Sequence, residues 1–234
     1  MRVPYTWLKE FIEFSNLPED VADRLTMTGL EVEGAESVEG DTIFEVNVTP
    51  NRPDCLSILG IARELAAVLK SPLKIPPCEF QGVQPASEYS VEILDPDLCN
   101  RYTGRVLTGV RISDSPEWIQ KRLEKCGIRS INNIVDITNY VLLEFGHPLH
   151  AFDADLLAMK KVRVGSPDTI QGQLQQTKMQ TLDGIEREIP HDSLLIWDAD
   201  KPIAVAGVMG GMNTEVTDRT NNVFLESAYF DPVS

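Results

Sequence analysis

Two of the chain's three histidines, His147 and His150, lie three residues apart, and Asp153 follows three residues later. Imidazole and carboxylate groups at such spacing can bind a metal ion. Pro148, however, breaks the helix that would align the histidines, and the sequence shows no fourth ligand, so we expect no metal site. His150 is then either a core histidine bonded to a nearby carbonyl or an imidazole placed to orient a ligand.

Glu226 lies in the apolar stretch VFLESAYF, where a carboxylate is costly to bury unless it accepts hydrogen bonds. Two interpretations stay open. Glu226 is a polar anchor in a pocket, or it lies with Phe224 on the solvent face of an alternating strand.

The segment Ile203–Gly211, IAVAGVMGG, predicts a strand of small residues that runs into a glycine turn. Glycines there would let a ligand approach the backbone closely, although a tight structural turn explains them equally well. The spacing matches no phosphate-binding loop. The chain also lacks G-x-S-x-G, H-E-x-x-H and any signature around a cysteine, so the familiar hydrolase motifs are missing.

A helix is expected to position His150, because apolar residues recur at helical spacing before it and Gly146 then ends the pattern. The buried face should carry Ile134, Ile137, Val141 and Phe145. The other sides should carry Asp136, Asn139 and Glu144. Pro148 then forces a turn that places His150 after the end of the helix.

The residues before this helix predict further elements in order. Helices are expected around Trp7–Ile12, over Pro18–Thr28, over Ile58–Leu69 with Asp54 or Ser57 as its cap, and after Ser115 as a cap. Strands are expected at Leu30–Glu33 and Ile43–Val48, joined through Gly34–Asp41, and at Val91–Leu94 and Tyr102–Val110.

After the helix the hydrophobic period changes to two. Strands are expected at Lys161–Val164, Leu194–Trp197 and Val223–Leu225, with a hairpin turn at Asp183-Gly184. The expected fold class is therefore α+β: a small N-terminal domain with a helical hairpin and strands, and then a mixed α+β domain with a substantial sheet.

Composition restricts the class of protein. A formal net charge of −15 argues against strong binding of nucleic acid, although residues 100–129 carry seven Lys or Arg against three acids. Those basic residues are either an RNA contact or a solvated helix face. The four cysteines form no C-x-x-C pair, and the sequence shows no signal peptide or membrane segment, so we expect a cytoplasmic protein.

The chain contains, in this order, LTMTGLEVEG, VTPNRPDCLS, GIARELAAVL, NRYTGRV, CGIRSINNIVDITNYVLLEFGHPLHAFD, TLDG, AVAGVMGG and FLESAYFDPVS. Together these pieces resemble the N-terminal part of the beta subunit of bacterial phenylalanyl-tRNA synthetases. The resemblance implies a B1-like domain over residues 1–75, a Pro-rich linker over 76–90 and a B3/B4 tRNA-editing domain over 91–234.

In that family the editing domain hydrolyses tyrosine wrongly attached to phenylalanine tRNA, and it does not itself aminoacylate. The resemblance implies His150 and Glu226 as catalytic residues. It implies substrate contacts by Thr138, Asn139, Pro148, Ala206 and Gly207. The alternative is a non-catalytic scaffold that binds a free aromatic amino acid or serves only subunit assembly.

The resemblance also implies partners. They are the synthetase alpha subunit in an alpha2beta2 enzyme, phenylalanine tRNA bound weakly, and tyrosine as the editing ligand, with no membrane. We expect no cofactor in this chain, because ATP and magnesium serve the aminoacylation site of the whole enzyme. The family usually carries a tRNA-binding oligonucleotide-fold domain where this chain has only residues 34–41, and it continues past Ser234, so the chain is expected to be truncated there.

Overall fold

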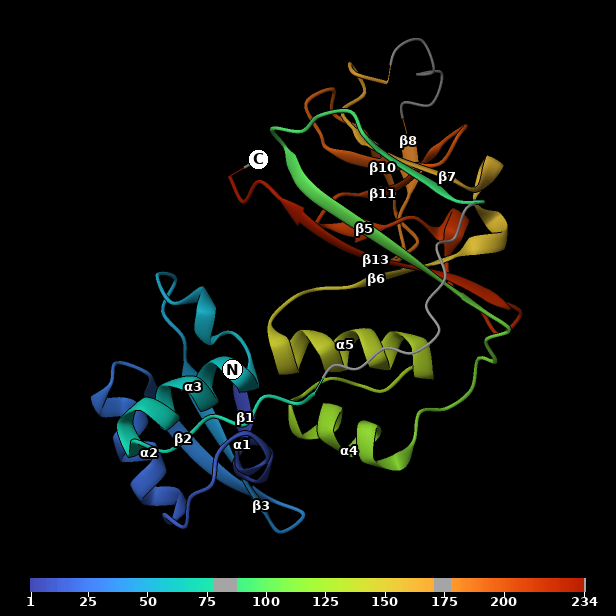
Figure 1. Ribbon diagram of the computed structural model, residues 1–234. Helices are drawn as coiled ribbons and strands as arrows, with labels where there is room; N and C mark the ends of the chain where they lie inside the picture. Colours follow the sequence, from blue (N-terminus) through green and yellow to red (C-terminus); the bar gives the residue numbers. More distant parts are fainter. Residues whose placement is uncertain (78–87, 171–177, 234) are drawn as a thin grey trace. The chain divides into compact units, whose positions relative to one another are not determined.

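The computed structural model describes residues 1–77, 88–170 and 178–233. The chain divides into two compact units, each built from two stretches of sequence. Unit 1 holds Met1–Gly82 and Asp114–Pro148, and unit 2 holds Val83–Ser113 and Leu149–Ser234. The expected α+β class is confirmed (Figure 1). Residues 78–87 of the predicted linker, which include Cys78, lie outside the described residues, as does Ser234.

The described part of unit 1 combines five α-helices with a three-stranded antiparallel sheet of order β1-β3-β2. Its elements are β1 (Arg2–Pro4), α1 (Tyr5–Phe11), α2 (Pro18–Met27), β2 (Glu31–Val38), β3 (Asp41–Asn47), α3 (Ile58–Leu69), α4 (Glu117–Lys125) and α5 (Asn133–Phe145). Strand β2 continues through most of the stretch expected to be a connection. The turn needs only Glu39 and Gly40, whose positive φ of 50° and 76° suits a tight hairpin.

The core of unit 1 lies between the sheet and helices α1, α2 and α3. Trp7, Leu8 and Phe11 of α1 are buried there. Helix α3 begins after Ser57, whose Oγ accepts a hydrogen bond from the amide of Gly60 at 3.0 Å. Of the two caps considered from the sequence, Ser57 is therefore the cap.

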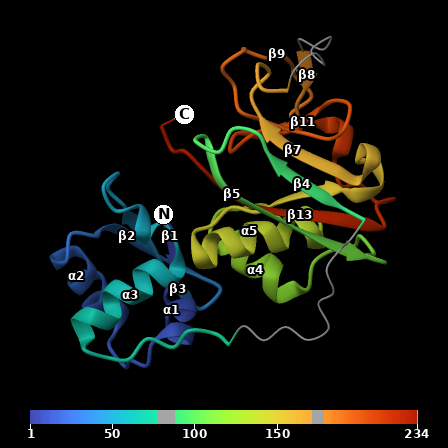
Figure 2. The same cartoon turned by 45° about the horizontal axis from the view of Figure 1, so that its top comes forward.

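Helices α4 and α5 pack against each other (Figure 2) and belong to unit 1, so the units divide the chain differently from the linear domains expected. Aromatic and charged contacts explain the difference. The rings of Trp7 and Tyr140 lie 5.0 Å apart, and Nζ of Lys125 lies 3.1 Å from a carboxylate oxygen of the buried Asp41.

The expected buried face of α5 was wrong in part. Asp136 is fully buried and Glu144 is buried, whereas Ile137 and Phe145 are 43% and 46% exposed. Asp136 tolerates burial because its carboxylate accepts hydrogen bonds from the hydroxyls of Ser115 and Ser130, each at 2.5 Å.

Ser115 was also expected to cap α4. Its hydroxyl instead donates to Asp136, and α4 begins after Pro116 without a side-chain cap. The Ser115 hydroxyl is directed at the buried carboxylate of Asp136, where a hydrogen bond to a charged acceptor is stronger than one between neutral groups.

Unit 2 contains a five-stranded sheet of order β12-β11-β10-β7-β4 and a three-stranded sheet of order β5-β13-β6. In the larger sheet β4 runs parallel to β7, and the other pairs are antiparallel. The smaller sheet is antiparallel throughout, with β13 between its neighbours (Figure 1). The strands of these two sheets are β4 (Ser90–Ile93), β5 (Cys99–Thr108), β6 (His150–Asp153), β7 (Lys161–Gly165), β10 (Leu195–Trp197), β11 (Pro202–Val205), β12 (Met209–Gly210) and β13 (Asn222–Phe230).

The predicted turn at Asp183-Gly184 is confirmed. It joins β8 (Lys178–Gln180) to β9 (Glu186–Glu188), and Gly184 has a positive φ of 78°. The apolar core of unit 2 gathers side chains from both larger sheets, among them Phe152, Phe224 and Ile203.

Candidate functional site

The centre of the three-stranded sheet brings together the two residues expected to do chemistry. Glu226 of β13 lies directly opposite His150 of β6 on one side and Gly104 of β5 on the other. Residues directly opposite each other on antiparallel strands point their side chains to the same face. The sheet therefore places the Glu226 carboxyl and the His150 imidazole as neighbours.

That face is turned into the core of unit 2, because Phe224 and Phe152 lie opposite each other one step along the same strands and are both buried. Glu226 itself is only 8% exposed. Of the two interpretations of Glu226, the solvent-face one is therefore wrong.

The Glu226 carboxyl accepts a hydrogen bond at 2.5 Å from the hydroxyl of Tyr102, a buried residue of β5. Burial raises the pKa of Glu226 to about 7, and the bond from Tyr102 offsets part of that rise. Burial together with the nearby Glu226 raises the pKa of Tyr102 well above its usual range. The phenol therefore stays protonated and acts as the donor.

The His150 imidazole is in an apolar setting. Its ring packs edge-on against Phe152, with centroids 4.5 Å apart. Burial lowers the pKa of His150 to about 4, so the imidazole is neutral at pH 7. Within the described residues no hydrogen bond reaches this ring, so the carbonyl partner considered from the sequence is not found there.

The glycine segment approaches the same imidazole. A Cβ placed on Gly210 would lie 2.5 Å from Cε1 of His150 and 2.9 Å from Leu182, so only glycine fits between these side chains. The predicted strand and turn are confirmed as β11, a turn and β12.

Ala206 and Gly207 form the turn after β11. The amide of Ala206 donates to the carbonyl of Leu194 at 3.0 Å, and Gly207 adopts a positive φ of 68°. A Cβ on Gly207 would lie 3.4 Å from the ring of Phe230, near the end of β13. Both residues thus belong to unit 2, and their contact with a substrate stays a prediction.

The other three predicted residues belong to unit 1. Thr138 and Asn139 lie on α5, where the Thr138 hydroxyl donates to the carbonyl of Val135 at 2.7 Å, and Pro148 is exposed after the helix ends at Gly146. Their role as substrate contacts stays a prediction.

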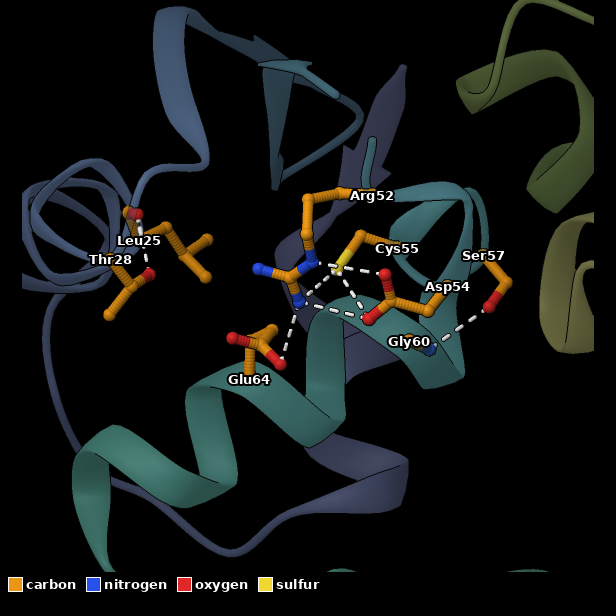
Figure 3. A network of polar contacts seen from close by, with 8 residues as sticks. All are labelled: Leu25, Thr28, Arg52, Asp54, Cys55, Ser57, Gly60 and Glu64. Carbon is orange, nitrogen blue, oxygen red and sulfur yellow. Dashed lines mark hydrogen bonds and ion pairs between the residues drawn. The ribbon is translucent and has the colours of Figure 1, made fainter. Parts of the chain in front are cut away.

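A second polar cluster lies in unit 1, at the start of α3 (Figure 3). Asp54, Cys55 and Glu64 offer possible metal ligands within 4.8 Å of one another among the described residues. The Arg52 guanidinium, however, already contacts all three groups, at 2.9 Å to each carboxylate and 3.0 Å to the sulfur.

Arg52 thus pairs with both carboxylates at once, and the cluster keeps one net negative charge. The bond from Arg52 lowers the pKa of Asp54 to about 2, and burial raises the pKa of Cys55 to about 11. A protonated thiol is a poor metal ligand and a poor nucleophile, so the cluster is an ion pair that ties the loop to α3.

Sequence reasoning missed two residues of the site in unit 2. Tyr102 could have been found from the sequence, because it begins a predicted strand and shares one face of that strand with Gly104, two residues later. Gly210 lies within the predicted glycine segment. Its contact with His150, however, joins residues 60 positions apart, and no local sequence pattern predicts such a contact.

Comparison with known proteins adds the family. A family model described as the B3/4 domain matches residues 98–234. The phenylalanine–tRNA ligase beta subunit of Carboxydothermus hydrogenoformans is 50% identical over 194 residues, which cover 83% of this chain and 24% of that protein. The corresponding subunit of Rhodopirellula baltica is 40% identical over 236 residues, which cover 100% of this chain and 34% of that protein.

The chain therefore spans only a quarter to a third of the length of these relatives. The alignment with the Rhodopirellula protein leaves no room for a domain-sized insertion near residues 34–41, so that relative also lacks the insert expected there. Among solved structures, an N-terminal fragment of the phenylalanyl-tRNA synthetase beta subunit from Pyrococcus horikoshii shares the fold. Its TM-score is 0.53 at 17% identity, covering 99% of this chain and 68% of that one.

Proposed function

The chain belongs to the B3/4 domain family, and from this we propose that unit 2 hydrolyses the ester of tyrosine wrongly attached to phenylalanine tRNA. Its relatives are phenylalanine–tRNA ligase beta subunits, which supports a role for this chain in protein synthesis. An enzyme of that kind must separate two amino acids that differ by one hydroxyl group.

The buried carboxyl of Glu226 is the observation that carries this proposal. A site built to accept a hydrogen bond from a phenol leaves its acceptor unpaired when phenylalanine enters, and such sites discriminate by roughly 10⁴-fold or more. Glu226 is 8% exposed and lies in an apolar core, where a carboxyl oxygen without a hydrogen bond is costly. Tyr102 donates to Oε2 only. The hydroxyl of a substrate tyrosine would donate to Oε1, and phenylalanine offers no such donor.

His150 supplies the second part of the chemistry. In the proposed step a water oxygen bonds to the ester carbonyl carbon, the bond from that carbon to the ribose oxygen breaks, and a proton from the water ends on the ribose oxygen. Because the imidazole is neutral at pH 7, one of its nitrogens can accept a hydrogen bond from the attacking water and orient it. No protein nucleophile is required.

The test is deacylation of Tyr-tRNA(Phe) and Phe-tRNA(Phe) by this chain and its variants. Glu226→Ala should abolish the preference for the tyrosyl ester, and Glu226→Gln, which keeps the shape, should reduce it about ten- to a hundredfold through loss of the charged acceptor. Asp153→Asn is the matched control, since Asp153 is a buried carboxylate on β6 that bonds Thr220 instead. If Glu226→Ala still prefers the tyrosyl ester, Glu226 is not the discriminating group.

A second candidate is a non-catalytic scaffold whose pocket binds free aromatic amino acid. The low pKa of His150 favours it, because an imidazole with a pKa of about 4 is a weak base. Calorimetric titration with tyrosine separates the two functions. Binding of tyrosine without turnover of the ester supports the scaffold.

The remaining properties are proposed by analogy with the relatives. We propose that the chain acts in the cytoplasm with an alpha subunit, which uses ATP and magnesium for aminoacylation, and that it contacts the tRNA only weakly by itself. Thr138, Asn139 and Pro148 remain predicted substrate contacts. No described helix is both long and apolar enough to cross a bilayer.

A further inference from the structure

We propose that Tyr102 is a positioning residue that sets the tyrosine preference of this site. Its phenol holds one oxygen of the Glu226 carboxylate and leaves the other oxygen to accept from the substrate's phenol. This inference rests on the editing function proposed above and deepens it.

The sheet register explains how Tyr102 reaches Glu226. Tyr102 of β5 lies opposite Ala228, and Glu226 lies opposite Gly104, so the two side chains are diagonal neighbours on one face. Diagonal pairs lie about 7–8 Å apart at the backbone, within reach of an aromatic side chain. Ala228 is small, which leaves the phenol free to lean along the face toward the carboxylate.

The space around the pair restricts where the carboxylate can turn. A Cβ on Gly104 would lie 2.1 Å from the ring of Phe224, so that ring fills the place directly across from Glu226. Tyr102 and Glu226 are 8% exposed each. The carboxyl torsion of glutamate is intrinsically broad, and a bond to a buried phenol is what fixes it here.

The two carboxylate oxygens then have different tasks. Oε2 accepts from the Tyr102 hydroxyl at 2.5 Å. Oε1 accepts no hydrogen bond from any described residue. Among these residues, Tyr102 is the one side chain that donates a hydrogen bond to this carboxylate. A substrate phenol therefore meets a single acceptor oxygen of fixed direction, and phenylalanine leaves it unpaired.

The experiment compares the tyrosyl and phenylalanyl esters of phenylalanine tRNA in wild type and Tyr102→Phe. The variant removes one hydroxyl and keeps the ring. We expect the ratio of kcat/KM for the two esters to fall about ten- to a hundredfold, the value of one hydrogen bond to a charged group. The loss should lie mainly in KM for the tyrosyl ester, and kcat/KM for the phenylalanyl ester should change only a few-fold.

Tyr89→Phe is the matched control. Tyr89 packs on the same Phe224, with ring centroids 6.1 Å apart, but its hydroxyl makes no hydrogen bond to Glu226. The ratio of kcat/KM for the tyrosyl and phenylalanyl esters in Tyr89→Phe should equal that of wild type. A Tyr102→Phe variant with the wild-type ratio, or one that loses both esters equally, overturns the proposal, because equal loss is what a purely structural tyrosine would cause.

A second measurement separates this inference from the proposed function. In ¹³C NMR of glutamate-labelled protein, Glu226→Gln identifies the Glu226 carboxyl signal by its disappearance. Tyr102→Phe should move the midpoint of that signal to higher pH, because a donor to the ionised form has been removed. An unmoved midpoint overturns the positioning role. If wild type hydrolyses neither ester, the editing function fails, and a moved midpoint then shows that the pairing exists without it.

Discussion

At the scale of single residues, burial acts in opposite directions on the two neighbours at the centre of the sheet. It raises the pKa of the Glu226 acid to about 7 and lowers the pKa of the His150 base to about 4. In both cases the neutral form is favoured. Groups whose pKa is shifted by burial occur at functional sites more often than elsewhere, which supports the proposal that this pair belongs to the functional site.

These shifts predict how stability depends on pH. The folded state holds the Glu226 proton more tightly than the unfolded chain does, so its contribution is present below pH 4.5 and is lost as pH rises to about 7. A shift from 4.5 to about 7 corresponds to roughly 3 kcal/mol. The free energy of unfolding of wild type relative to Glu226→Gln, measured in urea, should therefore fall over this range.

His150→Gln serves as the opposite control. The folded-state pKa of His150 is depressed from 6.5 to about 4, so its contribution is present above pH 6.5 and is lost as pH falls through 4. Wild type relative to this variant should gain stability as pH rises. A flat difference for Glu226→Gln between pH 4.5 and 7 would show that Glu226 is not buried as described.

At the scale of elements, α5 shows how a polar residue can organise a helix. The carboxylate of Asp136 joins the hydroxyls of Ser115 and Ser130 and the amide of Ile131, which lies 2.8 Å from it. These donors come from the segments before α4 and before α5. Asp136 therefore ties the connections around both helices together.

Asp136→Ala should lower the free energy of unfolding by about 2–4 kcal/mol, since it leaves several donors without their acceptor in a buried place. Chemical denaturation measures this directly. Asp23→Ala, an exposed acid on α2 of the same unit, should change stability by less than about 0.5 kcal/mol. Equal effects of the two substitutions would contradict an anchoring role for Asp136.

At the scale of the whole molecule, the net charge of −15 opposes binding of a polyanion. We expect this chain to bind phenylalanine tRNA weakly, with affinity that falls as salt rises from about 50 to 200 mM, because a few cationic contacts act against a repulsive background. Fluorescence titration with labelled tRNA measures the dissociation constant and its dependence on salt concentration. Tight binding that salt does not weaken would show that the charge argument fails.

The relatives bear on the same question. The insert that the resemblance leads one to expect near residues 34–41 is also missing from the Rhodopirellula baltica protein, which aligns with the whole chain. In its place β2 and β3 form a continuous hairpin that turns at Glu39 and Gly40. The sheet of unit 1 is therefore complete without an inserted domain.

The sequence by itself determined the local structure. Hydrophobic period, caps and turn residues located the helices that became α2, α3 and α5, and Asp183-Gly184 located a hairpin. The motif order identified the family, and it singled out the segment with His150 and the strand with Glu226. These signals are local, so a reading along the chain can recover them.

Only the tertiary structure decided what those residues face. The period of α5 put Ile137 and Phe145 inside, yet Asp136 is the buried residue, because donors from the segments before α4 and before α5 reach its carboxylate there. Glu226 lies opposite His150, and Tyr102 reaches Glu226, because β13 pairs with strands more than seventy residues away in the sequence. No local pattern encodes such a register, because it is set by which faces the sheet can bury together.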